Sequence, residues 1–210
     1  MWFDESVRRL NGEGRGRLLG AFGPDDRMLL VMATGAYELV KPEMSVHFPD
    51  DMIFLDKWHR DRALTVAHLD GEKKAVYVKR FVAESSTKTV SFIGEEEGSK
   101  MLLFTDHGAP IVKCKAKDLG EQRFSLNEFI AIKGVKARGK RLSTDARAKV
   151  TLEDTPDPNL EATQVEAAAA ETAPEAQITN TPPSAPEKGA EGPASDTENP
   201  AGGEVQSTLF

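Results

Sequence analysis

Residues 27–41 read Arg-Met-Leu-Leu-Val-Met-Ala-Thr-Gly-Ala-Tyr-Glu-Leu-Val-Lys. Two apolar runs, each long enough for a strand, lie on either side of a Thr34-Gly35 pair. Glycine readily adopts the left-handed backbone conformations that tight turns require. The stretch therefore predicts a β-hairpin with its turn at Gly35.

The same pattern recurs twice along the chain. Residues 63–80 place an Asp-Gly pair, a strong hairpin signal, between two apolar runs, and residues 100–113 repeat the arrangement. The central glycines, Gly35, Gly71 and Gly108, are 36 and 37 residues apart. Repeats at this spacing predict an all-β fold in which hairpin blades form a propeller-like array, each burying one face against its neighbour. An ordinary meander of hairpins is the alternative.

Charge and composition divide the chain near residue 150. Residues 1–150 contain 26 Lys and Arg against 22 Asp and Glu, a net charge of +4. Residues 151–210 contain one basic residue, Lys188, against 12 acids, and consist largely of Ala, Glu, Pro, Thr and Gly. Such a segment buries too little apolar surface to offset the entropy of ordering it. We therefore expect a folded domain over 1–150 and a disordered acidic tail over 151–210.

Cysteine usage and hydropathy indicate the compartment. Cys114 is the one cysteine, so no intrachain disulfide can form, which is typical of a reducing compartment. The first residues lack the layout of a secretory signal, and no apolar run reaches about 18 residues, the length of a membrane span. A cytoplasmic protein without a membrane partner is the expectation. The four histidines share no metal-ligand spacing, so no metal site is predicted.

The stretch Lys133–Arg141, read as Lys-Gly-Val-Lys-Ala-Arg-Gly-Lys-Arg, contains five basic residues and no acid. Because these cations repel one another, their grouping favours a polyanion such as a nucleic-acid backbone, which binds with release of counterions. A nucleotide-binding loop is unfavoured, since Arg141 stands where Ser or Thr would hold Mg²⁺. A solvated basic turn is the alternative. The candidate DNA contacts here are Lys133, Lys136, Arg138, Lys140 and Arg141.

Further cations are expected to extend this basic surface. The second strand of each predicted hairpin ends on a basic residue. In a radial array these strand ends would lie along one rim, so their cations would form one curved basic track. Three alternating lysines are predicted to point to one face of a strand, with protection of a sheet edge as the alternative. Two arginines near the N-terminus alternate in the same way. The candidate contacts in these groups are Arg15, Arg17, Lys79, Arg80, Lys113, Lys115 and Lys117.

Several segments follow one another in a recognisable order: Trp2–Glu5, Arg9–Asn11, Val76–Phe81, Ser91–Gly94 and Phe129–Leu142. With the Gly-Arg-Gly stretch after Asn11, they resemble the C-terminal region of the A-type subunit of bacterial topoisomerase IV and gyrase. The resemblance is closest to the topoisomerase IV type and covers residues 1 to about 145. It implies a partial β-pinwheel, a propeller with strand exchange between blades, whose basic outer rim binds and bends duplex DNA.

The resemblance also implies the partners. They are double-stranded DNA, the cleavage core of the A-type subunit, and the B-type subunit, which would supply the ATP and Mg²⁺ sites of the holoenzyme. The gyrase-type Gln-Arg-Arg-Gly-Gly-Lys-Gly box is absent, and Lys136–Lys140 is at most a degenerate relative. A role in decatenation and chromosome segregation at the nucleoid is therefore favoured over negative supercoiling.

The catalytic tyrosine of that family lies in a domain that has no counterpart here. Tyr37 and Tyr77 both fall in returning strands and are expected to be packed sheet residues. We therefore expect a fragment of three or four blades that holds no cofactor and does not cut DNA alone. The alternative function is a β-repeat module whose basic rim docks an acidic protein partner.

The last five residues, Gln-Ser-Thr-Leu-Phe, are similar to the Gln-x-x-Leu-Phe peptide with which bacterial replication proteins dock on the sliding clamp. A flexible tether ending in an apolar anchor suits the binding of a partner. Gln206, Leu209 and Phe210 are therefore predicted to contact the clamp. A frayed chain end is the alternative.

Overall fold

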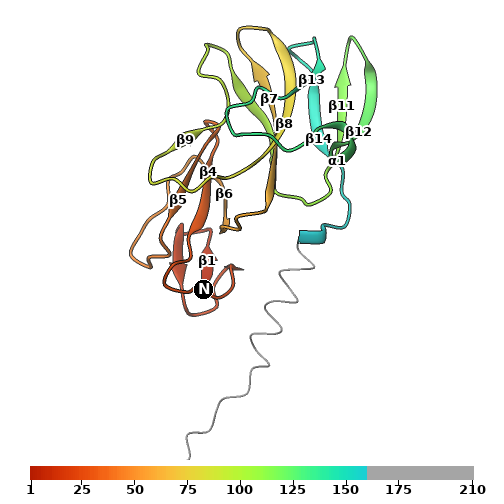
Figure 1. Cartoon of the computed structure of the whole chain (residues 1–210). Coiled ribbons are helices and arrows are strands. Elements are labelled where there is room, and N and C mark those ends of the chain that lie inside the picture. The colour runs from red at the N-terminus through yellow and green to blue at the C-terminus, as the bar shows by residue number, and fades with distance from the viewer. Residues whose placement is uncertain (160–210) are drawn as a thin grey trace, which may run out of the picture. The chain divides into compact units, whose positions relative to one another are not determined.

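The computed structural model describes residues 1–159, and this part of the chain is an all-β body. It contains four antiparallel sheets, here called A to D, and one short helix, α1 (Leu126–Phe129) (Figure 1). The all-β class predicted from the hairpin pattern is confirmed. Among these residues, no helix has the length and apolar character needed to cross a lipid bilayer.

Sheets A and B come from the first 91 residues. Sheet A has the strand order β2-β1-β3, and sheet B has the order β6-β4-β5-β9. In the hairpin β4–β5, Gly35 makes the turn with φ +82°, as the sequence predicted. The strands are β1 (Trp2–Asp4), β2 (Arg9–Asn11), β3 (Arg17–Leu18), β4 (Met28–Met32), β5 (Ala36–Val40), β6 (Met52–Lys57) and β9 (Val90–Ser91).

Sheet C has the order β10-β7-β8-β13, and its central hairpin β7–β8 confirms the second predicted hairpin. The turn is longer than the two-residue turn that an Asp-Gly pair usually makes. Residues 71–74 form it, and the Asp70 carboxylate accepts a hydrogen bond from the Lys73 N–H at 2.9 Å. The strands are β7 (Ala63–Asp70), β8 (Ala75–Val82), β10 (Lys100–Thr105) and β13 (Lys140–Ser143).

The third predicted hairpin, with its turn at Gly108, does not form. Sheet D has the order β12-β11-β14, with β11 (Ile111–Ala116), β12 (Gly120–Ser125) and β14 (Lys149–Leu152). β10 and β11, predicted to pair around Gly108, lie in different sheets, because β10 fills the edge of β7 that the β7–β8 hairpin leaves open. The Gly108 N–H instead donates to Asp157 Oδ1 at 2.9 Å, so this glycine sits in a crossing between sheets.

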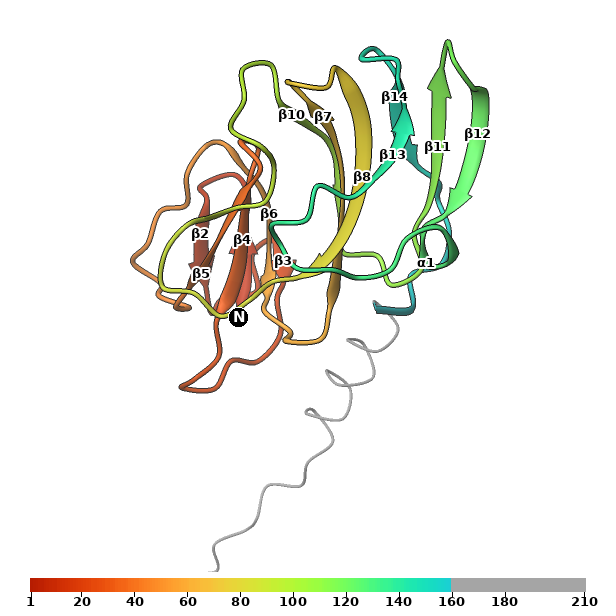
Figure 2. The same ribbon diagram turned by 45° about the horizontal axis from the view of Figure 1, so that its top comes forward.

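Strands are exchanged between neighbouring sheets. Sheet B is completed by β9, which follows the central hairpin of sheet C, and sheet C is completed by β13, which follows the first two strands of sheet D. Figure 2 shows β13 running beside β8 after the chain has passed through α1. The apolar run Phe129–Ile132 closes α1 and makes one isolated bridge from Ile132 to Arg80.

Three buried clusters join the sheets in the order A, B, C and D. The apolar residues of β4 contribute to two of these clusters, because Met28 and Leu30 face sheet A while Leu29 and Val31 face sheet C. Alternate residues of a strand point to opposite faces, so a continuous apolar run suits a sheet that is covered on both sides. The same rule orients β8: Phe81 packs toward sheet B, and Val76 and Val78 pack toward sheet D.

The predicted boundary at residue 150 falls inside β14 and is corrected by the residues that follow. Glu153 donates its N–H to the Ile111 carbonyl at 2.8 Å, and its carboxylate pairs with Arg123 at 2.5 Å. Further along, the Thr155 carbonyl and the Asp157 carboxylate contact the segment 107–108. These contacts extend the body to residue 159. The predicted disorder of the tail and its docking peptide fall on 160–210, outside the described residues.

Candidate nucleic-acid interface

The basic stretch Lys133–Arg141 is an irregular loop that enters β13 at its last two residues. Val135 anchors it by inserting into the apolar cluster between sheets B and C, where it is 5% exposed. A turn from the Gly134 carbonyl to the Ala137 N–H, at 2.9 Å, then reverses the chain. Gly139 follows with φ +100°, so close to β8 that a Cβ would lie 2.2 Å from the Val78 carbonyl oxygen. The loop therefore has a defined path over sheet C.

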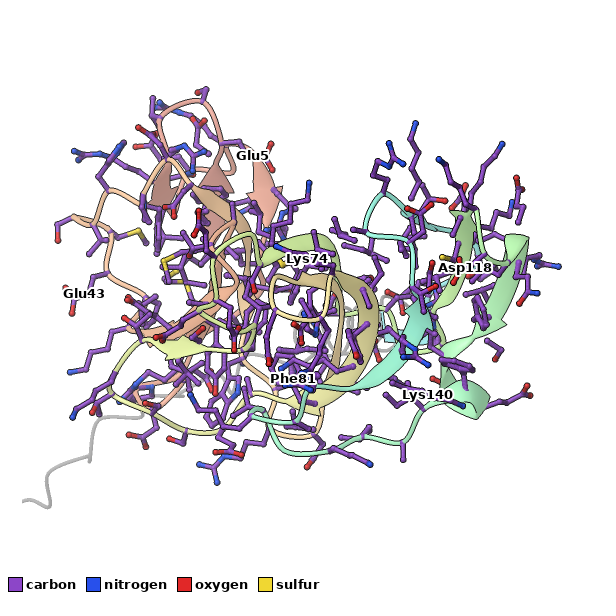
Figure 3. All side chains as sticks on the ribbon, turned by 90° about the horizontal axis from the view of Figure 1, so that it is seen from above. Glu5, Glu43, Lys74, Phe81, Asp118 and Lys140 are labelled. Atoms are coloured by element: carbon purple, nitrogen blue, oxygen red, sulfur yellow. The ribbon has the colours of Figure 1, made fainter. Side chains whose placement is uncertain are left out.

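Three cations of this loop are free to meet a ligand. Lys133, Lys136 and Arg141 are exposed, and none of them has an ion pair among residues 1–159. The other two are engaged. Arg138 pairs with Asp70 at 3.0 Å and with Glu72 at 3.7 Å, while the Lys140 ammonium lies 3.8 Å from the Phe129 ring centroid, beside α1 (Figure 3). The exposed and unpaired cations are the ones available to a polyanion.

Two predicted contacts, Lys79 and Arg80, are corrected by the structure, because both side chains are buried. Lys79 is 4% exposed and donates from Nζ to the Val135 carbonyl at 2.7 Å and to the Ala137 carbonyl at 3.1 Å. Arg80 is 7% exposed, and its Nε has no hydrogen-bond partner in the described part of the chain. The loop covers Lys79 by accepting both of its hydrogen bonds, and the burial of both side chains keeps them from a ligand on the surface.

Burial changes the acid–base properties of this site. It lowers the pKa of Lys79 to about 8, with the charge of Lys136 as a second cause. Burial also lowers the pKa of Arg80 and of His68. The His68 Nε2 donates to the Arg138 carbonyl at 3.0 Å, so the other ring nitrogen carries no proton in the neutral form. Lys79 and His68 both donate to carbonyls of the loop and so hold it from beneath.

Two of the three alternating lysines, Lys113 and Lys115, point to one face of β11 as predicted, whereas Lys117 falls outside the strand. Val112, Cys114 and Ala116 are buried against sheet C, so Lys113 and Lys115 point outward from sheet D. Each has a loose carboxylate neighbour, Glu153 at 3.6 Å for Lys113 and Glu121 at 3.8 Å for Lys115. Lys117, the third of the alternating lysines, lies just beyond the strand and is exposed. Whether these lysines contact DNA stays a prediction.

Sequence reasoning missed three further cations near this face. Lys149 of β14 lies directly across from Lys115 of β11, an arrangement of like charges that costs a sheet stability. Lys149 also lines an open groove of about 520 Å³ with Lys100 and Arg147, between the edges of sheets C and D. No acidic side chain lines this groove. The alternation in Ala-Arg-Ala-Lys-Val, residues 146–150, was the signal that could have revealed two of them.

The two predicted arginines near the N-terminus, Arg15 and Arg17, lie at sheet A, away from the basic loop's sheet C. Arg17 belongs to β3 of sheet A and donates to the Leu55 carbonyl, while Arg15 is exposed and pairs with Glu13. The predicted cations are therefore divided among sheets A, C and D. Their membership of one curved track stays a prediction.

Neither tyrosine has the setting of a nucleophile. Tyr37 is fully buried, and its hydroxyl donates to the Glu84 carbonyl at 3.2 Å, while Tyr77 stacks on His68 with 6.0 Å between ring centroids. This agrees with their prediction as packed sheet residues. Within residues 1–159, no three His, Cys, Asp or Glu side chains are grouped so as to hold a metal ion. The predicted tail contacts Gln206, Leu209 and Phe210 lie outside the described residues.

Comparison with the sequence models of known families gives a match. The sequence model of a family described as the topoisomerase C-terminal domain of Bacteroidota matches residues 9–155. This range covers most of the chain and nearly all of the β body. No curated protein and no solved structure matches the chain.

Proposed function

Because the chain belongs to the topoisomerase C-terminal domain family of Bacteroidota, we propose that its β body binds and bends duplex DNA for a type II topoisomerase. In this proposal it is the C-terminal region of the A-type subunit of topoisomerase IV. It presents the duplex to the cleavage core of that subunit for ATP-dependent strand passage and decatenation. The ATP and Mg²⁺ needed for that reaction bind to the B-type subunit.

The observation that supports DNA binding most strongly is the basic loop. Lys133, Lys136 and Arg141 are exposed and unpaired within residues 1–159, yet the loop that carries them follows a defined path over sheet C. Repulsion among these cations costs stability, and a phosphate backbone would compensate for it by exchanging condensed counterions for protein cations. Contacts to phosphates would position the duplex without reading its sequence.

Charge reversal tests the proposal. Lys136→Glu with Arg141→Glu should weaken binding to duplexes of different sequence by the same factor, because phosphates are the same in each. Lys73→Glu with Lys74→Glu, in the exposed β7–β8 turn, is the matched control and should have a smaller effect. Equal losses in both pairs would show that only net charge matters. No change in either would refute the role of the loop.

A second candidate function, docking of a protein partner, is favoured by a different observation. Of the seven large apolar side chains exposed in residues 1–159, five lie in the first 53 residues. One of them, Ile53, lines a groove of about 520 Å³ together with Arg17 and Leu55. DNA binding that is weak and insensitive to salt would favour this function over the first. The five exposed side chains are Val7, Leu18, Met44, Val46 and Ile53.

A further inference from the structure

The face of sheet C that looks toward sheet B carries two kinds of residue. At one end, Leu64 and Phe81 form part of the apolar cluster between the sheets. Further along the same strands, Lys79 lies beside Val66, and both are buried. A buried lysine in the middle of a strand is unusual, because removing an ammonium group from water is costly unless it finds acceptors.

The acceptors of Lys79 come from the basic loop. Its ammonium group donates to the Val135 and Ala137 carbonyls at 2.7 and 3.1 Å, and lies 5.3 Å from the Phe81 ring centroid. His68, two residues beyond Val66 on β7 and on the same face, donates to the next carbonyl, that of Arg138, at 3.0 Å. Three carbonyls of the loop are thus turned inward onto two side chains of sheet C. The exposed cations are turned outward as a consequence.

We propose that Lys79 is a positioning residue for DNA binding: its buried amine fixes the loop so that Lys133 and Lys136 face the phosphates. This inference rests on the proposed function for its biological meaning, but the effect of Lys79 on the loop can be measured without DNA. The sequence predicted Lys79 as a direct DNA contact, and the proposal gives it an indirect role instead. Lys79 affects binding only through the exposed cations that it positions, since its own amine does not reach the surface.

The pH dependence of the loop follows from the same geometry. With the loop closed, the pKa of Lys79 is about 8, whereas a solvated lysine has its ordinary value of 10.5. The closed loop therefore binds fewer protons than the open one, so a rise in pH from 7 to 9 favours closure. A neutral amine keeps two N–H groups, enough for both carbonyls. The charged groups facing Lys79 across the adjoining pocket are His68, Asp70, Glu95, Glu96, Lys136 and Arg138.

Amide hydrogen exchange tests the effect on the loop. Protection of the Lys133 and Ala137 amides, which donate to the Arg80 and Gly134 carbonyls, should increase from pH 7 to pH 9 in the full-length protein. Lys79→Met should lower that protection about tenfold, since the two carbonyls lose their donors. Lys79→Arg should keep the protection but lose its pH dependence, because arginine stays protonated. Unchanged protection in Lys79→Met would overturn the proposal.

A double-mutant cycle tests the effect on DNA binding. Lys79→Met should weaken binding about tenfold in the native background, as its loop loses the buried hydrogen bonds. It should have little effect when Lys133→Gln and Lys136→Gln are already present, because the cations that Lys79 positions are then gone. The same loss in both backgrounds would mean that Lys79 acts by direct contact or general stability, which overturns the proposal.

Gly139→Ala is a second variant that removes no charge. Its φ of +100° and the approach to the Val78 carbonyl leave no room for a methyl group, so it should displace the loop and reproduce the effect of Lys79→Met. Binding that Gly139→Ala leaves at the native level would contradict a role for loop conformation. If none of the proteins binds DNA, the proposed function fails, while the exchange measurement still decides what Lys79 does to the loop.

Discussion

Replacing Phe81 with alanine tests the interface between sheets B and C, on which the path of the basic loop depends. The Phe81 ring (labelled in Figure 3) is fully buried. Its centroid lies 5.4 Å from that of the Phe92 ring and 6.4 Å from that of the Tyr37 ring. Phe92 and Tyr37 belong to the sheet B side of the cluster, so the substitution opens a cavity shared by two sheets. Buried Phe→Ala substitutions cost about 3–5 kcal/mol of unfolding free energy.

We expect Phe81→Ala to lower the unfolding free energy by about 4 kcal/mol, since two ring contacts are lost with the apolar burial. Urea unfolding followed by tryptophan fluorescence measures it, because Trp58 packs against the same cluster and donates to the Ala83 carbonyl at 3.1 Å. Met44→Ala, at a side chain 47% exposed, is the control and should change stability by no more than about 0.5 kcal/mol. A loss below about 1.5 kcal/mol for Phe81→Ala would refute the reasoning, since Phe81 would then not fill a shared core.

Three further outcomes follow from the structure. Ser143 and Thr144 donate to the Asp118 carboxylate and hold its pKa at about 2, so the stability it provides should be present above pH 4 and be lost as the pH falls toward 2. Thermal unfolding at pH 5 and pH 2.5 should therefore show a smaller drop in Tm for Asp118→Asn than for the native protein; an equal drop would exclude this carboxylate as the cause. A chain ending at Val150 should be less stable in urea than one ending at Asn159, because it lacks the pairing of β14 beyond Val150 and the Glu153–Arg123 ion pair; equal stability would contradict the extension of the body to residue 159. Changing Lys100, Arg147 and Lys149 together to glutamine should reduce the slope of log K against log salt by about 3 if all three contact phosphates, and leave it unchanged if the groove is not part of the DNA surface.

Local patterns were sufficient for the hairpins that form between neighbours in the sequence. The turns after Met32 and Asp70 connect strands that pair with each other, so a pattern of apolar runs and glycine was enough to find them. The pairing around Gly108 could not be found in this way, because β10 joins the open edge of β7, some 35 residues earlier. Exchange of strands between sheets depends on which edges remain free, and that is a property of the assembled fold.

The same limit explains the errors in the predicted interface. In Val-Tyr-Val-Lys-Arg-Phe, residues 76–81, two cations near the end of a strand match the pattern of surface residues. A loop more than 50 residues later covers Lys79, and no local pattern contains that information. By contrast, the prediction that Lys113 and Lys115 share one face of a strand was correct. It could be made because the sequence of the strand itself shows these lysines alternating with apolar residues.

The central claim is that exposed cations of the β body contact DNA phosphates, and the salt dependence of binding tests it most directly. If Lys133, Lys136, Arg141, Lys113, Lys115 and Lys149 each meet one phosphate, log K should fall against log salt with a slope of about −5. Changing the three loop cations to glutamine should reduce the slope to about −3. A slope near zero in the native protein, or one that the loop substitutions leave unchanged, would contradict the account.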